Sequence, residues 1–370
     1  MAREQRKRLL LLSVGYGQGH HSAAYALSEY YDNQGWDSRV VDVCEMAQPL
    51  GFKITQRFYS FCVRRAPWLW GVTYALTDTA DWARLVNQPF FKRVVDYARV
   101  LLQEYNPHLV ICTYPLFAYI LDKLRDGGVE VPPCVVVVTD AREISRPWMK
   151  TKAPLVIVPD TGSRRMMMER YALAPERIAA AGFPVHKAFV QSVARQAPTH
   201  CNLRVLYGAY RQTSGVINDI DALLSNFPQL KLTVIGANRA GRIAAHFTEA
   251  CSSGRLTVLR STRNMAELLA ESHFYIGKAG AATMFECYAC NVPVIVNFLL
   301  PGQELGNLDL LLSDSAGCHV ESTNHLVLSL SGLLEHNAFG WSLCCTAMKH
   351  ANRVGAVGKI ADAINKKFQL

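Results

Sequence analysis

The chain has 370 residues, half of them apolar and 19% charged, which provides enough apolar mass for two domains and excludes disorder as the main state. Lysine and arginine number 39 against 30 aspartates and glutamates, and the net charge of +9 favours an anionic partner such as a nucleic acid, an acidic membrane or a phosphorylated ligand. Eleven cysteines are too few for a disulfide scaffold and no run of about 18 apolar residues occurs, so we expect a cytoplasmic protein with reduced thiols and no spanning helix.

Short apolar and β-branched runs alternate with helical stretches along the chain, a pattern typical of parallel α/β units. The first half has five such runs, at residues 9–14, 39–43, 109–113, 134–139 and 155–158. The second half has five more, at residues 203–206, 231–235, 256–259, 274–276 and 292–296. They predict an α/β fold of two doubly wound, Rossmann-like domains that face each other across a cleft.

A polar stretch at residues 191–202 separates the two sets of predicted strands. We therefore expect an N-terminal domain over residues 1–198 and a C-terminal domain over residues 199–345. Residues 346–370 carry apolar side chains at helical spacing and predict a helix that packs back towards the N-terminal domain. Because ligands of such sheets bind beyond the carboxyl ends of the strands, we expect the functional residues in the loops that follow the strands.

The first predicted strand leads into a glycine-rich loop and then a helix. Gly17 and Gly19 would let the backbone turn sharply and approach a ligand, and the helix start offers free N–H groups to an anion. Asp42 ends the second strand roughly where a dinucleotide-binding fold places its ribose-binding acid. A nucleotide-dependent epimerase or oxidoreductase acting on a soluble substrate is therefore an alternative function.

His20 lies at the junction of this loop and the helix. A histidine at that place can take a proton from an attacking hydroxyl near neutral pH. The same residue could instead cap the helix or bond a backbone carbonyl. Asp140, which follows the strand predicted at residues 134–139, is a rival base or a partner for His20.

A long insertion at residues 45–106 combines aromatic side chains with positive charge. Residues 50–100 hold eight lysines and arginines against three aspartates, so about an eighth of the chain carries +5 of the net charge of +9. Such a composition is typical of a segment that lies in a membrane interface, and no nucleic-acid recognition motif accompanies it. The alternative is a helical hairpin with its aromatic side chains in a core and its cations in solvent. The residues we expect at the membrane are Arg57, Arg64, Arg65, Trp68 and Trp70.

Small and polar residues follow two predicted strands of the second half. Residues 280–282 would expose N–H groups at a helix start, which suits a diphosphate. Thr283 and Glu286 share one face of that helix, where they could bond a phosphate and a ribose diol. Gln303 and Glu304 stand at the next helix start, where they could hold sugar hydroxyls, although helix capping explains the same residues without a ligand.

These motifs resemble a known enzyme family. The blocks at residues 264–268, 278–286 and 301–307 are similar to the donor half of family 28 glycosyltransferases, which have the two-domain GT-B fold. Residues 16–20 resemble the first loop of the lipid-sugar branch of that family, the monogalactosyldiacylglycerol synthases and processive diacylglycerol glucosyltransferases. Residues 182–185 match the segment that ends the family's first domain. The resemblance spans roughly residues 9–320.

The resemblance implies transfer of a hexose from a UDP-sugar to a lipid hydroxyl such as that of diacylglycerol, in one inverting displacement. It implies His20 or Asp140 as the base, no cofactor beyond the donor substrate and no metal, and a peripheral place on the inner face of the membrane. The donor-binding residues that it implies are Gly280, Ala281, Ala282, Thr283, Glu286, Gln303, Glu304, Asn307 and Met265.

The chain departs from the family pattern at two places. A triple-glycine loop usually follows the first strand of the second domain, and here the chain reads Gly208-Ala209-Tyr210. A histidine usually precedes the proline and tryptophan that follow Thr139 and Asp140, and here Arg146 stands in its place. The first departure concerns the donor phosphates and the second concerns the acceptor.

Overall fold

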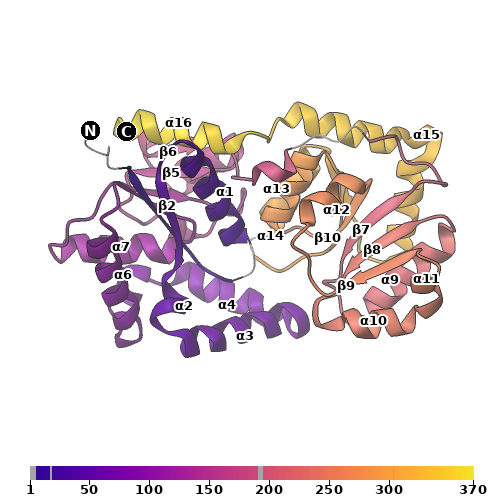
Figure 1. Cartoon of the computed structure of the whole chain (residues 1–370), viewed down its shortest axis with the longest axis horizontal. Coiled ribbons are helices and arrows are strands. Elements are labelled where there is room, and N and C mark those ends of the chain that lie inside the picture. The colour runs from indigo at the N-terminus through magenta and orange to yellow at the C-terminus, as the bar shows by residue number, and fades with distance from the viewer. Residues whose placement is uncertain (1–5, 17–18, 191–194, 303) are drawn as a thin grey trace. The chain divides into compact units, whose positions relative to one another are not determined.

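The computed structural model describes residues 6–16, 19–190, 195–302 and 304–370 (Figure 1). The chain divides into two compact units. The first comprises residues 1–62, 68–186 and 355–370, and the second comprises residues 63–67 and 187–354. The expected boundary between the two domains was at residues 198–199, and the second unit resumes at residue 187. The expected C-terminal segment began at residue 346, and the chain returns to the first unit at Gly355.

The first unit is built on a parallel sheet of six strands in the order β2-β1-β3-β4-β5-β6. Because β1 lies inside this sheet, its alternating side chains enter two cores. Leu9 and Leu11 pack with Leu27 of α1, and Leu10 and Leu12 pack with side chains of α6 and α7. The strands are β1 (Arg8–Ser13), β2 (Asp37–Asp42), β3 (Leu109–Cys112), β4 (Cys134–Val137), β5 (Leu155–Val158) and β6 (Ile178–Ala180). Its helices are α1 (Gly19–Asn33), α2 (Val43–Ala47), α3 (Pro49–Arg65), α4 (Pro67–Thr79), α5 (Trp82–Leu85), α6 (Lys92–Tyr105), α7 (Pro115–Asp126), α8 (Thr161–Tyr171) and α16 (Ala356–Phe368).

The second unit is built on another parallel sheet of six strands, in the order β12-β11-β10-β7-β8-β9. Val205 and Tyr207 of β7 pack with α9 and α15 in its core. The strands are β7 (Arg204–Gly208), β8 (Lys231–Ile235), β9 (Leu256–Leu259), β10 (Phe274–Lys278), β11 (Val294–Phe298) and β12 (Gly317–His319). Its helices are α9 (Thr213–Asn226), α10 (Ala240–His246), α11 (Thr248–Ser252), α12 (Met265–Glu271), α13 (Ala281–Cys290), α14 (Glu304–Ser313) and α15 (Thr323–Ala351).

The predicted fold class, α/β with two Rossmann-like domains, is confirmed, and all ten predicted strands are present. The sequence analysis missed β6 and β12, which are three-residue strands at the edges of their sheets and too short to show a pattern. Short 3₁₀ turns also connect the elements, at Pro89–Phe91, Arg146–Trp148, Pro175–Arg177, Lys187–Phe189 and Ala237–Arg239.

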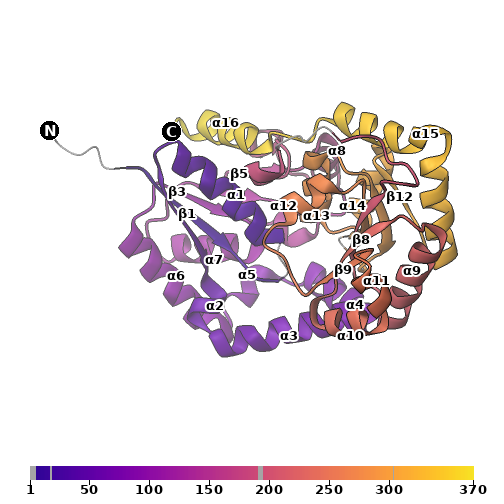
Figure 2. The same ribbon diagram turned by 45° about the vertical axis from the view of Figure 1, so that its right-hand side comes forward.

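The C-terminal segment consists of α15, which is kinked at residues 335–338 where the backbone is not helical and ends at Ala351, followed by α16. Helix α16 lies beside α1 and β5 of the first unit, as Figure 2 shows from a second side. Ile360 and Ile364 enter the core that holds Leu9 and Leu11 of β1, so the last helix of the chain completes the first unit.

Candidate functional site

His20 is held at the carboxyl edge of the first sheet by groups distant in the sequence. Its Nδ1 lies 2.8 Å from the carbonyl oxygen of Thr113 and 2.8 Å from Oγ1 of Thr139. A carbonyl oxygen can only accept, so Nδ1 carries the hydrogen and Nε2 keeps its lone pair. The ring of Tyr114 packs edge-on against the imidazole with centroids 5.1 Å apart. The sequence offered two roles for His20, a base or a partner for a backbone carbonyl. The two roles are compatible, because the carbonyl is bonded at Nδ1 and Nε2 remains able to accept a proton.

The surroundings keep this imidazole neutral. Burial is the main cause that lowers the pKa of His20 to about 4, while the bond to Thr113 opposes the shift and the neighbouring His21 adds to it. At neutral pH the residue can therefore accept a proton at Nε2. Asp140, the rival base, follows directly after Thr139 and is half-buried. Burial is the main cause that raises the pKa of Tyr74 on α4, and the charge of Asp140 is the next cause.

The first loop is anchored through Asp42. One carboxylate oxygen accepts the N–H of Gly15 at 2.8 Å and the other accepts the N–H of Glu45 at 3.0 Å, so Asp42 caps α2 and holds the loop at once. Nε2 of His21 approaches the same carboxylate at 3.7 Å. The two oxygens that the dinucleotide alternative needs for a ribose are thus engaged by the backbone. Gly19 begins α1, and Gly17 lies outside the described residues.

The inner face of α3 also holds this loop. The amide of Gln56 donates to the carbonyl of Gly15 at 2.9 Å, and the hydroxyls of Thr55 and Tyr16 lie 2.8 Å apart. The ring of Tyr16 contacts Phe52 of α3 on one side and Tyr114 on the other, with centroids 5.3 and 6.0 Å apart. The basic aromatic insertion is therefore in direct contact with the residues that surround His20.

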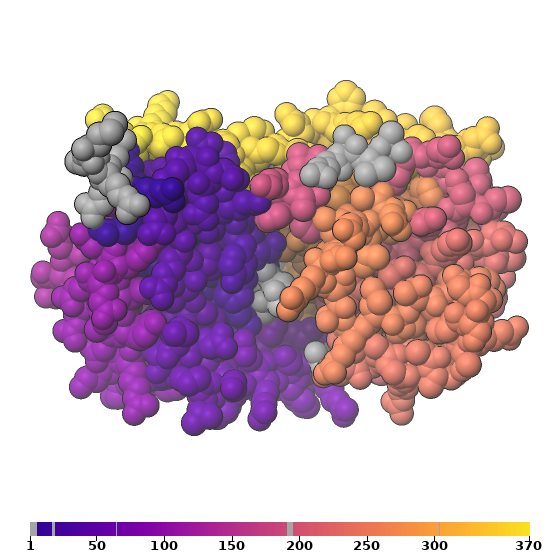
Figure 3. Space-filling model, viewed as in Figure 1, coloured from indigo at the N-terminus to yellow at the C-terminus, as the bar shows by residue number. Residues whose placement is uncertain are grey.

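The outer face of the α3–α4 hairpin exposes a row of large apolar side chains. On α3 they recur every three or four residues, which places them on one face of the helix, and Lys53 and Arg57 are exposed beside them. On α4 a second row has the same spacing. The hairpin lies along the lower edge of the surface in Figure 3. These side chains and their exposed fractions are Leu50 (78%), Ile54 (66%), Phe58 (45%), Phe61 (51%), Trp68 (70%), Val72 (49%) and Leu76 (66%).

The five predicted membrane residues do not all lie on that face. Arg57, Arg65 and Trp68 are exposed. Trp70 is half-buried, and its ring packs edge-on against Tyr59 with centroids 4.8 Å apart. The side chain of Arg64 lies outside the described part of the chain. Some aromatic side chains of the hairpin therefore pack inside it and others face outward, and the membrane role of the exposed ones stays a prediction.

In the second unit, the predicted donor residues gather at the carboxyl edge of the sheet. Gly280 precedes the first turn of α13, in which Ala281 is buried and Ala282 and Thr283 are half-buried. Lys278 closes β10 and folds over Gly280, where an added Cβ would lie 2.9 Å from its ammonium nitrogen. A side chain at position 280 would therefore displace the end of the lysine from its present place. The helix start offers backbone N–H groups to an anion beside this ammonium.

Glu304 stands at the start of α14, as expected, and its side chain is paired inside the protein. It is 1% exposed, with one carboxylate oxygen bonded to the Lys278 ammonium and the other accepting the N–H of Leu300 at 2.8 Å. Each carboxylate oxygen thus already has one partner inside the protein, and the contact with a sugar hydroxyl stays a prediction. Glu304 instead fixes the lysine at the start of α13.

Asn307, one turn further along α14, is buried and donates to the carbonyl of Ala279 at 3.0 Å, so it ties α14 to the loop before α13. Glu286 is 8% exposed on α13. Met265 is half-buried at the first position of α12. Gln303 lies outside the described residues, so the structure does not address its predicted contact with the sugar.

Tyr210 fills the place that the family pattern leaves to glycine. Its ring folds back over Gly208, where an added Cβ would lie 2.7 Å from a ring carbon, and the Lys278 ammonium lies 5.6 Å from the ring centroid. The departure noted in the sequence therefore places an aromatic ring next to Lys278, among the predicted donor residues.

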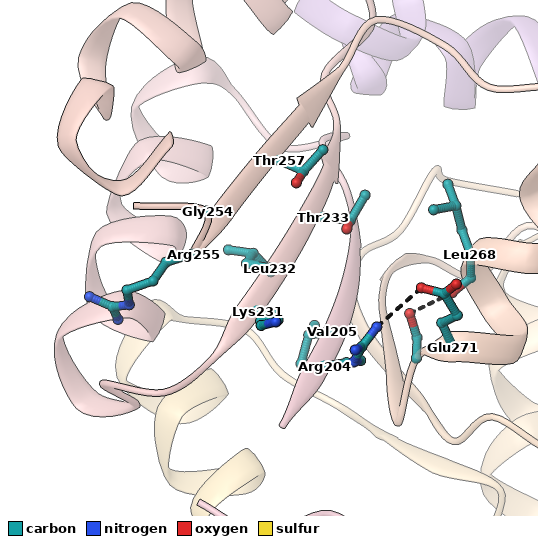
Figure 4. Close-up of a pocket in the computed structure, with 11 residues that line it drawn as sticks. Arg204, Val205, Lys231, Leu232, Thr233, Gly254, Arg255, Thr257, Leu268 and Glu271 are labelled. Atoms are coloured by element: carbon teal, nitrogen blue, oxygen red, sulfur yellow. Dashed lines mark hydrogen bonds and ion pairs between the residues drawn. The ribbon is translucent and has the colours of Figure 1, made fainter. Parts of the chain in front are cut away.

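A polar pocket of about 170 Å³ lies elsewhere on the second unit (Figure 4). It is lined by Arg204 and Lys231, which begin β7 and β8, and by Glu271 of α12. The carboxyl ends of parallel strands point to the other edge of the sheet, so this pocket is separate from the donor half.

Comparison with solved structures defines the class of fold. MurG from Acinetobacter baumannii superposes with a TM-score of 0.60 at 14% identity, covering 97% of this chain and 99% of that one. The glycotransferase of kitacinnamycin superposes with a TM-score of 0.63 at 11% identity, covering 98% and 99%. A putative UDP-N-acetylglucosamine 2-epimerase from Listeria monocytogenes gives 0.61 at 11% identity, covering 98% and 97%. The protein therefore has the GT-B fold, which by itself does not separate a transferase from an epimerase.

Sequence comparison places the chain more closely. The family model for monogalactosyldiacylglycerol (MGDG) synthase matches residues 20–185. The chloroplastic MGDG synthase of Spinacia oleracea is 25% identical over 98% of this chain and 73% of its own length. The processive diacylglycerol β-glucosyltransferase of Bacillus subtilis is 25% identical over 89% of this chain and 87% of its own length. The predicted resemblance to this glycosyltransferase branch is confirmed, and the family model matches the half that holds His20 rather than the donor motifs.

Proposed function

We propose that the protein is an inverting hexosyltransferase of glycolipid synthesis, which moves a hexose from a UDP-sugar to a lipid hydroxyl such as that of diacylglycerol. The observation that carries the proposal is His20, a neutral imidazole with its Nε2 lone pair kept, in the unit that also bears an exposed apolar and cationic hairpin. The names of the relatives, which act on diacylglycerol or form a galactolipid, support the same substrate class.

The acceptor half activates the hydroxyl. Nε2 of His20 takes the hydroxyl proton while the oxygen forms a bond to the anomeric carbon of the sugar. The bond from Nδ1 to the Thr113 carbonyl holds the tautomer and supports the positive charge that develops on the ring. Asp140 stays the rival base or a partner for His20 in this proposal.

The donor half supports departure of the nucleotide. As the bond from the anomeric carbon to the phosphate oxygen breaks, negative charge accumulates on the leaving diphosphate. The start of α13 and the Lys278 ammonium are preorganised for that charge, since Glu304 holds the lysine and is itself held by the N–H of Leu300. Glu286 would hold the ribose.

We further propose that the α3–α4 hairpin docks the enzyme on an anionic membrane surface. The apolar rows would enter the interface and the exposed Lys53, Arg57 and Arg65 would face the lipid headgroups. No helix in the described parts of the chain is long and apolar enough to cross a membrane. We expect a peripheral protein on the inner face of the membrane.

The test is transfer of labelled sugar from UDP-glucose, UDP-galactose and UDP-N-acetylglucosamine into organic-extractable product, with anionic liposomes that contain diacylglycerol. Labelled lipid from one donor is the expected result. Binding of UDP without labelled lipid would reject the acceptor, where Arg146 departs from the family pattern. Binding of a nicotinamide dinucleotide in place of UDP would overturn the proposal in favour of the oxidoreductase alternative, and conversion of the UDP-sugar to its epimer would favour the epimerase.

A further inference from the structure

The second unit holds two ion pairs of the same design. In each pair the carboxylate is buried and the cation is partly open to solvent. The Asp219 side chain is 0% exposed against 23% for Arg211, and the Glu304 side chain is 1% exposed against 21% for Lys278. Both pairs therefore direct positive charge outward from a buried negative group.

Asp219 is the centre of a hydrogen-bonded network. One of its oxygens accepts from Arg211 at 2.7 Å and from the hydroxyl of Thr323 at 2.6 Å. The other accepts from the hydroxyl of Tyr207 at 2.7 Å and from the amide of Asn297 at 3.0 Å. With four donors around it, the buried carboxylate is fixed, and it holds the guanidinium in one position. Asp219 and the exposed Asp221 have an Asp-x-Asp spacing, but all four hydrogen bonds of Asp219 are to groups inside the second unit.

Arg211 lies at the same edge of the sheet as the predicted donor residues. It follows β7, and β7 is hydrogen-bonded to β10, which ends at Lys278. The ring of Tyr210 lies next to the Lys278 ammonium, so the loop after β7 contacts the end of β10. Arg239 fixes this loop further, because its guanidinium donates to the carbonyls of Ala209 and Arg211.

A diphosphate suits such a pair of cations. It carries negative charge on two phosphates, and a guanidinium held in advance loses little side-chain freedom when it binds a phosphate. In this chain the loop after β7 ends in an arginine that has its own buried counter-ion.

We propose that Arg211 binds the diphosphate of the sugar nucleotide together with Lys278, and that Asp219 is the positioning residue that fixes Arg211. This inference rests on the proposed function, because it assumes a nucleoside diphosphate sugar as the donor. It adds Arg211, which the motif-based prediction did not include, to the residues that would bind the diphosphate.

The test is calorimetric titration of the whole protein with UDP and with uridine. Arg211→Gln is expected to weaken UDP binding about 10- to 100-fold, which is what a charge-assisted hydrogen bond to phosphate supplies, and to leave uridine binding within 2-fold. Arg211→Lys keeps the charge and is expected to fall between the wild type and Arg211→Gln. Asp219→Asn is expected to weaken UDP binding about 3- to 10-fold with uridine unchanged.

Arg204→Gln is the matched control, since Arg204 begins the strand that Arg211 follows and its removal changes the net charge equally. It is expected to leave UDP binding within 2-fold. Equal UDP affinity of the wild type and Arg211→Gln would overturn the inference while the proposed function stands. Absence of UDP binding by the folded wild type would reject the proposed function itself. Equal losses for UDP and uridine would show that Arg211 is structural and would also overturn the inference.

Discussion

Docking through the hairpin makes a quantitative prediction about charge. The structure places Lys53, Arg57 and Arg65 exposed on α3, on the helix that also exposes Leu50, Ile54, Phe58 and Phe61. Each such cation contributes about 1 kcal/mol near an anionic leaflet, so replacing all three by serine should cost about 3 kcal/mol. This free energy corresponds to roughly a 100-fold loss in partitioning at low ionic strength.

Co-sedimentation with phosphatidylglycerol-containing liposomes measures this loss. The difference between the wild type and the triple variant should shrink as salt is raised, because at 0.1 M salt exposed charges are screened beyond about 10 Å. The matched control is the triple serine variant of Arg204, Lys231 and Lys366, three exposed cations outside the hairpin that carry the same total charge. If this control lost as much binding, net charge alone would explain the attraction. If the hairpin variant bound like the wild type, the docking role of α3 would be wrong.

Three further predictions concern the two halves of the site. His20→Gln should abolish sugar transfer, because Gln has no basic nitrogen, while calorimetry should show UDP binding within 2-fold of the wild type; normal turnover would exclude His20 as the base. Because burial lowers the pKa of His20 to about 4 and the neutral form is the active one, kcat/KM should stay high down to about pH 5 and fall as the pH drops through 4. A fall centred near 6.5 would mean that the imidazole is not shielded as described. Glu304→Ala should destabilise the second unit by about 2–4 kcal/mol, since it leaves the N–H of Leu300 and the Lys278 ammonium without their partner, and thermal unfolding should show a Tm lower by roughly 5–10 °C. An unchanged Tm would contradict that structural role.

The sequence by itself determined the fold class. The strands are buried on both faces, so they appear as continuous apolar runs such as Leu9 to Leu12, and such runs alternating with helical stretches require parallel α/β layers. The order of strands and glycine-rich loops also placed His20 and the start of α13 after strands of their sheets, where the structure has them. These features depend on residues close together in the chain, which is why a pattern can show them.

Only the tertiary structure decided what each side chain contacts. Glu304 is bonded to Lys278, 26 residues earlier, and no local pattern showed this buried pairing. Trp68 and Trp70 look alike in the sequence, yet one is exposed and the other packs on Tyr59 because they leave α4 in different directions. The tautomer of His20 depends on Thr113, 93 residues away. Burial and hydrogen bonding between distant segments follow from how the sheets and helices pack, and no local spacing encodes them.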